Sequence, residues 1–196
     1  MKAHSKPALI LASASPRRRE LLDQIGIRYR VVVANLDEIA FHNEAPGDYV
    51  LRMACEKASV IMQREKAQVP VLGADTEVII DNRILGKPVD RRHAIEMLSG
   101  LSGRTHEVWS AVAVVLPDGR IFQDLSVTRV SFAVMEPAWI ETYCDTGDPM
   151  DKAGAYGVQG LAAQKIERLE GSYSGVMGLP LFETSKLLRQ AGLLDF

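Results

Sequence analysis

The chain has 196 residues, enough for one large domain or for two small lobes around a shared core. Hydrophobic residues make up 47% and charged residues 24%, the balance of an ordinary soluble globular protein. With 23 basic and 25 acidic side chains the net charge is −2. This excludes a protein that wraps duplex nucleic acid, because such a protein needs a large basic excess.

The two cysteines, Cys55 and Cys144, lie far apart in the sequence and have no partner at metal-ligand spacing. This argues against a disulfide scaffold and a structural zinc site, and it fits a reducing compartment. The apolar run near the N-terminus is far too short to span a membrane and precedes three arginines, so we interpret it as a core strand. We therefore expect a cytoplasmic chain with no membrane partner.

Glycine, proline and polar residues divide the chain into strands that alternate with helices. The first strand, over 8–12, leads to a helix that Ser15 caps, that has Pro16 in its first turn and that ends at Gly26. The further strands expected are 28–34, 69–74, 78–80, 83–85, 105–116, 120–134 and 165–169. The further helices expected are 48–66, 93–101, 136–144 and 181–190. Turn residues at 81–82 and 117–119 predict antiparallel hairpins, hence an α/β fold with a mixed sheet.

The segment from Ser13 to Arg19, SASPRRR, lies where the first strand passes into the first helix. A helix N-terminus offers backbone N–H groups and a partial positive charge, and both attract anions. Serine hydroxyls and arginine forks add donors that match phosphate oxygens. The alternative is a capped helix with solvated arginines, but cations in a first turn oppose the helix dipole. We therefore predict a phosphate site here, although no GxxxxGK[ST] sequence is present.

Lys57 lies in the middle of the apolar face of the helix expected over 48–66, between Met53 and Ile61. A lysine at such a position should not simply be buried. Either its stem extends past its neighbours and brings the ammonium to water, or the side chain points into a cleft and meets an anion. The residues alone leave both interpretations open.

Two acidic residues are candidates for chemistry. Asp75 directly follows the apolar run VLGA, so we expect it at the end of a buried strand, where α/β sheets usually carry catalytic groups. Its carboxylate is suited to holding a divalent metal or activating a water molecule, and the alternative is a turn-initiating aspartate. Glu38, in the polar loop after the second strand, is by itself best interpreted as a solvated loop residue. No histidine spacing indicates a histidine metal site.

Two loops add weaker candidates. Lys87 lies in the restrained turn Gly-Lys-Pro, where a solvated surface lysine is the common alternative. The segment 151–160, DKAGAYGVQG, contains Gln159, whose amide has donors and an acceptor and so can read the edge of a base. The glycine-rich stretch 171–180 is a further candidate for lining the same site.

An ordered set of segments runs from Leu9 to Leu188: SASPRRREL, Glu38, CEKA, LGADT, GKP, DKAGAYGVQG and GSY…GLP. Each is modest alone, but in this order and at these separations they resemble the Maf family. The resemblance implies one domain over residues 1–196 with a two-lobed Maf/ITPase-like α/β fold. In that fold helices flank a mixed, twisted sheet, and a deep cleft lies between the lobes.

The resemblance also implies hydrolysis of a nucleoside triphosphate between its α- and β-phosphates, with a divalent cation, Mg²⁺ or Mn²⁺, and it suggests a homodimer. Asp75 matches the family's general base, and Asp75 and Glu38 are the candidates for holding the metal. Arg17, Thr76 and Gln159 match its substrate-selecting positions. The other substrate-binding positions implied are Ser13, Arg18, Lys57 and Lys87.

Thr76 together with Gln159 resembles the subgroup that acts on dTTP and UTP. The subgroup that acts on 7-methyl-GTP tends to have glutamine at the first position and an acidic residue at the second. Two residues depart from the family pattern: Glu77 replaces an aliphatic residue, and Gly175 replaces a common asparagine. In an extended strand Glu77 shares a face with Asp75, but we expect Glu77 to be solvated at a sheet edge.

Other functions stay open at this stage. A nucleotide-sensing regulator of cell division, a role that the family name links to septum formation, predicts binding without turnover. A phosphatase that releases the γ-phosphate requires the same basic residues. A nucleic-acid-binding module fits least, because the charge balance is slightly acidic and only 6% of residues are aromatic.

Overall fold

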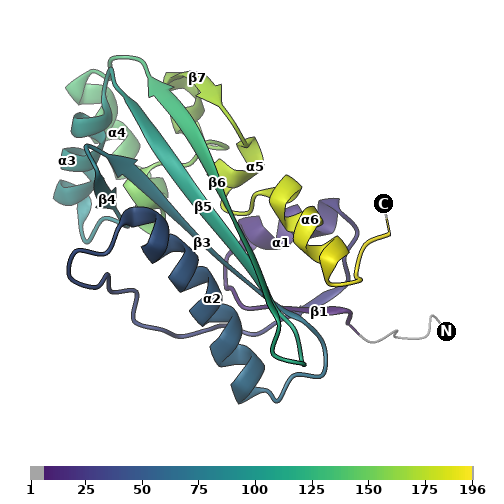
Figure 1. The fold of residues 1–196 in the computed structure, drawn as a ribbon. Coiled ribbons are helices and arrows are strands. Elements are labelled where there is room, and N and C mark those ends of the chain that lie inside the picture. Colours follow the sequence, from purple (N-terminus) through teal and green to yellow (C-terminus); the bar gives the residue numbers. More distant parts are fainter. Residues whose placement is uncertain (1–6, 196) are drawn as a thin grey trace. The chain divides into compact units, whose positions relative to one another are not determined.

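The computed structural model describes residues 7–195, in which strands and helices alternate along most of the chain (Figure 1). The strands are β1 (Leu9–Leu11), β2 (Tyr29–Val31), β3 (Val71–Ile80), β4 (Arg83–Leu85), β5 (Thr105–Val115), β6 (Ile121–Phe132) and β7 (Ile166–Glu170). The α-helices are α1 (Pro16–Gln24), α2 (Pro46–Arg64), α3 (Arg91–Leu101), α4 (Pro137–Asp145), α5 (Tyr173–Met177) and α6 (Leu181–Gln190). Short 3-10 helices are η1 (Asp148–Asp151), η2 (Ala153–Ala155) and η3 (Leu161–Lys165).

The strands form one seven-stranded sheet in the order β2-β1-β3-β5-β6-β7, with β4 paired to β3. β1 runs parallel to both β2 and β3, with Leu9 opposite Tyr29 and Ile10 opposite Val71. β4 is antiparallel to β3, and β7 is antiparallel to β6. The prediction of an α/β fold with a mixed sheet is confirmed. Among the described residues, no helix is both long enough and apolar enough to cross a membrane.

The chain divides into two compact units. The first consists of the described residues up to Asp75, of Ala111–Leu125 and of the chain from Gly178 onward; the second consists of Thr76–Ser110 and Ser126–Met177. The chain passes from one unit to the other within β3, within β5 and within β6. Each unit is described separately below.

In the first unit, α2 packs on β1 and on the first half of β3. Ala58 and Ile61 of the helix share a buried cluster with Ile10 of β1. Gly73 lets β3 approach α2 closely, because a methyl group at that position would lie 2.2 Å from the carbonyl oxygen of Ala54. The polar residue two positions further along β3 is thereby held close to the helix.

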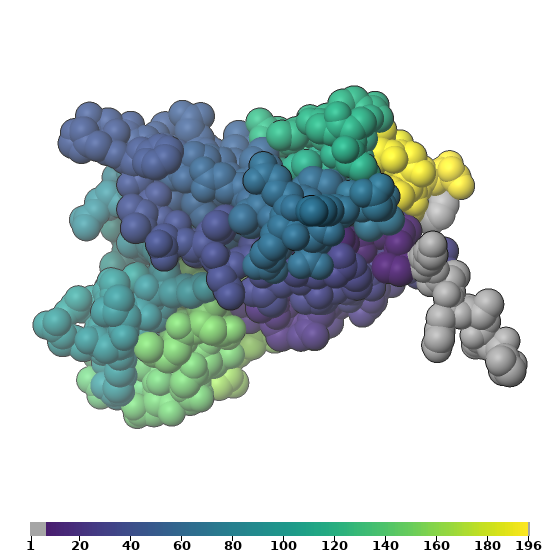
Figure 2. Space-filling model, turned by 90° about the horizontal axis from the view of Figure 1, so that it is seen from below, coloured from purple at the N-terminus to yellow at the C-terminus, as the bar shows by residue number. Residues whose placement is uncertain are grey.

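The C-terminal helix also belongs to the first unit. Lys186 of α6 binds Asp124 of β6, with the ammonium 2.9 Å from the carboxylate. Figure 2 accordingly shows the yellow C-terminal segment beside the green turn between β5 and β6. That turn has a backbone bond from Gly119 to Leu116 of 3.0 Å, as the turn residues 117–119 predict.

In the second unit, α3 and α4 pack on each other and on sheet residues (Figure 1). Leu98 of α3, Ile140 of α4 and Phe132 of β6 belong to one buried cluster. The predicted β3–β4 hairpin is confirmed, since Val78 pairs with Leu85. The fold differs from expectation in the glycine-rich stretch 171–180, which contains the short helix α5, because the Ser172 side chain accepts the backbone N–H of Gly175 and so caps a helical turn.

Candidate functional site

A buried lysine holds two carboxylates in the first unit. The Lys57 ammonium lies 2.6 Å from Oδ1 of Asp75 in β3 and 2.6 Å from Oε1 of Glu38 in the loop before α2. Lys57 is 6% exposed, and the residues that share its helical face are fully buried: Val50, Met53, Ala54, Ala58 and Ile61. The Lys57 ammonium is therefore buried and does not extend to water; it meets anions, and these are side chains of the protein.

This lysine–carboxylate cluster carries excess negative charge. Two carboxylates and one ammonium sum to a formal charge of −1. Asp75 is 4% exposed, and its second oxygen, Oδ2, is buried with no hydrogen-bond partner among the described residues. Removing one partner from a buried ion pair typically costs about 3–5 kcal/mol. The cluster is thus a place that a further positive charge or a hydrogen-bond donor would stabilise.

Two expectations for these acids are wrong. β3 does not end at Asp75 but continues through it to Ile80, because Lys57 compensates the carboxylate and allows it inside a buried strand. Glu38 is not merely a solvated loop residue, since it is paired with Lys57 while 40% of its side chain stays exposed.

The start of α1 has the polar character that the sequence predicts. The Ser15 side chain caps the helix by accepting the Arg18 backbone N–H. The Ser13 hydroxyl accepts two bonds of 3.2 Å, one from the Ser15 N–H and one from the Arg18 guanidinium. The same guanidinium donates to the Gly178 carbonyl over 2.8 Å, which fixes its direction. Ser13 is 7% exposed, and its own O–H stays available as a donor, since an oxygen that accepts two bonds still carries its proton. Arg17, in the same turn, is half-buried.

In the second unit, Thr76 begins a chain of hydroxyl bonds. Its Oγ1 lies 2.8 Å from Oγ of Ser110, and Ser110 donates to the Gly175 carbonyl over 2.6 Å. A serine hydroxyl has one proton, so in the first bond Thr76 must be the donor. The bond to Ser110 thus engages the Thr76 proton, so toward any further group this hydroxyl acts as an acceptor. The structure gives Gly175 a defined role here, since its carbonyl receives the Ser110 proton.

Glu77 is a correction to the sequence interpretation. We expected a solvated side chain at a sheet edge, but Glu77 lies in the interior of β3 and is 7% exposed. The physical reason is that β3 is covered along most of its length, since both faces of the strand contain buried residues.

Lys87 and Gln159 lie in loops of the second unit, and both side chains are exposed. The two loops are joined by a backbone bond of 3.1 Å from the Gly154 N–H to the Gly86 carbonyl. The structure therefore brings the Gly-Lys-Pro turn next to the segment DKAGAYGVQG. Neither the Lys87 ammonium nor the Gln159 amide has a hydrogen bond or ion pair to another described residue, so both are available to a ligand.

Sequence reasoning missed the residues that support these loops. His106 is 2% exposed, and its Nε2 lies 2.7 Å from the Tyr156 hydroxyl. Burial lowers the pKa of His106 to about 4, so the ring is neutral at physiological pH. Ser110 and Asp148 were likewise missed. None of the three lies in a recognisable sequence motif. Their roles come from hydrogen bonds to other side chains or to the backbone, which the sequence does not reveal.

A shallow hollow of about 390 Å³ lies elsewhere on the second unit, at the β3–β4 turn. It is lined by Ile79, Ile80, Asp81, Asn82, Thr105, His106, Glu107, Trp109 and Arg129. None of the predicted site residues lines it. Within residues 7–195 there is also no group of three or more His, Cys, Asp or Glu side chains arranged to hold a metal ion by themselves.

The first unit thus contains a helix start with serine and arginine donors and, in β3, a buried carboxylate. Residues 8–191 match the family of Maf-like proteins, and the chain belongs to this family. It is 52% identical to the dTTP/UTP pyrophosphatase of Bordetella avium over 95% of this chain and 96% of that protein. It is 51% identical to the dTTP/UTP pyrophosphatase of Alkalilimnicola ehrlichii, over 96% and 95% of the two chains. Among solved structures, a HAM1 protein from Coxiella burnetii aligns with 93% of this chain and 98% of its own, at 14% identity and a TM-score of 0.49.

Proposed function

We propose that this chain hydrolyses dTTP and UTP to the nucleoside monophosphate and pyrophosphate. The observation that carries the proposal is the cluster of Lys57, Asp75 and Glu38, in which the ammonium is paired with both carboxylates. Oδ2 of Asp75 is buried there and has no hydrogen-bond partner among the described residues. The relatives that share about half of their residues with this chain, and nearly its full length, have names that state the same substrates.

Asp75 acts as the general base in this proposal. Lys57 holds Oδ1 at 2.6 Å and so fixes the plane of the carboxylate. Oδ2, which has no hydrogen-bond partner among the described residues, is then the atom that accepts the proton of the attacking water. The water attacks the α-phosphorus, and the bond from the α-phosphorus to the bridging oxygen breaks, so that pyrophosphate leaves.

The phosphate charge is balanced by preorganised donors, which supply much of the rate in phosphoryl chemistry. We assign this role to Ser13, Arg17 and Arg18 at the start of α1, where the helix N-terminus adds its own partial charge. The Ser13 proton is a hydrogen-bond donor, and the two guanidinium groups contribute full positive charges. Lys87 adds an exposed ammonium on a restrained turn.

The acidic cluster also fits a divalent cation. Mg²⁺ in proteins is commonly held by one or two carboxylates together with substrate phosphates. Asp75 and Glu38 provide two carboxylates, and with the Lys57 ammonium the formal charge of the cluster is −1. Asp75 and Glu38 would hold Mg²⁺ or Mn²⁺, and the bound cation would neutralise negative charge on the phosphate oxygens.

Base selection is assigned to Thr76 and Gln159. The Thr76 hydroxyl donates its hydrogen bond to Ser110, so toward a base it acts as an acceptor. A lone pair suits the N3–H of uracil and thymine, whereas N3 of cytosine is itself an acceptor. The exposed Gln159 amide has two donors and an acceptor for the remaining edge of the base. We place the reaction in the cytoplasm. The family resemblance is the support for a homodimer, which light scattering on the purified protein tests.

The reaction is tested by phosphorus NMR of the purified protein with UTP, dTTP, CTP, GTP or 7-methyl-GTP, and with Mg²⁺ or Mn²⁺ present. We expect monophosphate and pyrophosphate from UTP and dTTP. Asp75→Asn removes the base while keeping the size of the side chain, so turnover should fall by about 10²–10⁴-fold, with nucleotide affinity measured by calorimetry largely kept. Asp145→Asn, which alters an exposed aspartate in α4, is the matched control and should behave as the wild type.

Each other result has a clear meaning. Nucleoside diphosphate with inorganic phosphate would move cleavage to the γ-phosphate. Preference for 7-methyl-GTP would overturn the assignment of base selection. Tight binding without turnover would favour a nucleotide-sensing regulator of cell division. Wild-type turnover in Asp75→Asn would reject Asp75 as the base.

A further inference from the structure

Gln159 is presented on a tight turn whose two ends are both glycine. The Gly160 N–H donates to the Gly157 carbonyl over 3.1 Å, which closes a four-residue turn around Val158 and Gln159. Val158 is 7% exposed and anchors the turn in the second unit, while Gln159 is exposed. The position of the Gln159 backbone therefore depends on what holds the two glycines.

Both glycines pack directly on one ion pair. A methyl group at Gly157 would lie 2.7 Å from Cε of Lys152, and one at Gly160 would lie 3.0 Å from Oδ2 of Asp148. A side chain at Gly157 would displace the end of the Lys152 side chain, and one at Gly160 would push the Asp148 carboxylate away by a few tenths of an ångström. Both ends of the turn therefore contact the ion pair: Gly157 lies against Lys152, and Gly160 lies against Asp148.

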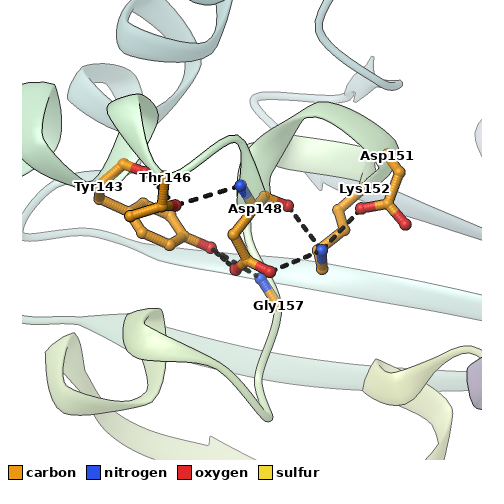
Figure 3. Close-up of polar contacts among 6 residues, drawn as sticks. All are labelled: Tyr143, Thr146, Asp148, Asp151, Lys152 and Gly157. Carbon is orange, nitrogen blue, oxygen red and sulfur yellow. Dashed lines mark hydrogen bonds and ion pairs between the residues drawn. The ribbon is translucent and has the colours of Figure 1, made fainter.

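The ion pair is itself held rigidly (Figure 3). The Lys152 ammonium donates to the Asp148 carbonyl at 2.6 Å, to Oδ1 of Asp148 at 3.0 Å and to Oδ1 of Asp151 at 2.7 Å. Three bonds use all the protons of an ammonium. Only 13% of the Lys152 side chain is exposed, so water does little to screen these contacts.

Tyr143 completes the support from the other side. Its hydroxyl donates to Oδ2 of Asp148 over 2.7 Å, and the Tyr143 hydroxyl oxygen itself accepts the Gly157 N–H over 3.4 Å (Figure 3). Burial raises the pKa of Asp148, but the bonds from Tyr143 and Lys152 outweigh it and lower this pKa overall. Asp148 therefore stays ionised, and the network keeps its charges at neutral pH.

We propose that Asp148, Lys152 and Tyr143 are positioning residues that fix the Gln159 turn and thereby set which base is accepted. The inference deepens the proposed function and rests on it. A merely structural ion pair would stabilise the second unit without affecting the choice between nucleotides. A positioning network affects that choice, because Gln159 contacts the base only when its backbone is in place.

The test measures selectivity with kcat/KM for UTP divided by kcat/KM for GTP. Lys152→Met keeps most of the stem that packs on Gly157 but removes all three ammonium bonds. We expect this ratio to fall by about tenfold, as expected when a hydrogen bond that discriminates between substrates is lost. Arg91→Met is the matched control, since it breaks the exposed ion pair with Asp145 on α4 and should leave the ratio unchanged.

A double-variant cycle separates positioning from stability. In a Gln159→Ala background, Lys152→Met should change the ratio by less than about twofold, because the residue that it positions is absent. Thermal melting of each variant reports any loss of stability. An unchanged ratio in Lys152→Met, equal losses for UTP and GTP, or equal effects of Lys152→Met with and without Gln159 would each overturn the inference. Failure of the proposed function would show separately, as a wild type that does not convert UTP to UMP and pyrophosphate or does not prefer UTP to GTP.

Discussion

At the scale of single residues, the donors and acceptors of this protein are set by neighbours. Thr76 has a hydroxyl that can donate or accept a hydrogen bond in solution. Here it donates to Ser110, because the Ser110 hydroxyl already donates to the Gly175 carbonyl. Lys57 is ordinary by type, and it acquires a role because two carboxylates meet its ammonium. In each case the chemistry depends on a partner far away in the sequence.

Removing the Ser110 hydroxyl should weaken the preference for uracil. In Ser110→Ala the Thr76 proton is released from that bond, so the same hydroxyl is able to donate to N3 of cytosine. We expect the ratio of kcat/KM for UTP to that for CTP to fall by about tenfold. Ser126→Ala, at another buried serine of the same unit, is the control and should keep the ratio. A ratio that does not move in Ser110→Ala would show that the polarity of Thr76 does not select the base.

At the scale of elements, the separation of α2 and β3 determines the geometry of the lysine–carboxylate cluster. Lys57 lies one turn after Ala54 in α2, and Asp75 lies two residues after Gly73 in β3. Because Gly73 rests almost on the Ala54 carbonyl, the two elements pass close enough for the 2.6 Å bond between Lys57 and Asp75.

Gly73→Ala should therefore damage both stability and activity. The added methyl group would be 2.2 Å from a backbone oxygen that cannot rotate away, so α2 and β3 must separate. We expect a loss of about 2 kcal/mol in the free energy of unfolding, measured by urea denaturation, and a fall in UTP turnover. Gly100→Ala is the contrasting control: Gly100 lies in α3 with open space around it, so the free energy should rise by about 0.5–1 kcal/mol. Equal stability of Gly73→Ala and the wild type would contradict the close-packing argument.

Local sequence signals predicted where most helices and strands lie, but they did not predict that β3 continues through Asp75. The Ser15 cap, the 81–82 hairpin and the last helix are set by neighbouring residues, and the structure confirms them. The strand through Asp75 was divided in two, because a carboxylate inside a strand suggests an end unless its lysine partner is known. For the same reason the burial of Glu77 was not foreseen.

The candidate site was predicted only as a set of residue types. Ordered motifs identified Asp75, Lys57 and the start of α1, but not which atoms meet. Asp148 and Tyr143 carry no pattern of their own, since their significance comes from Gly157 and Lys152. Hydrogen-bond networks of this kind depend on three-dimensional contacts between segments, which local periodicity does not encode.

At the scale of the whole molecule, burial of His106 should make stability depend on pH. Its pKa is about 4 in the folded chain, below the value of about 6.5 for an unfolded histidine. Between these values the unfolded chain binds a proton that the folded chain excludes, so stability is lost as the pH falls. From pH 7 to pH 5 this histidine alone should cost about 2 kcal/mol.

The measurement is urea unfolding at both pH values for the wild type and for His106→Gln, which keeps a polar partner for Tyr156 but does not titrate. The difference between pH 7 and pH 5 should be smaller in the variant by about 2 kcal/mol. Identical pH dependence in the two proteins would mean that His106 is protonated as readily in the folded chain as in the unfolded one.

The interrupted course of the chain has a consequence for its synthesis on the ribosome. Translation delivers all of the second unit by Met177, whereas the segment from Gly178 onward, which belongs to the first unit, emerges later. That segment supplies the Gly178 carbonyl that orients Arg18, and the α6 lysine that binds Asp124. A nascent chain therefore contains the Gln159 turn before it has the carbonyl that orients Arg18. If the start of α1 binds phosphate as proposed, a nascent chain without the segment from Gly178 onward should bind a nucleotide more weakly than the chain that contains it.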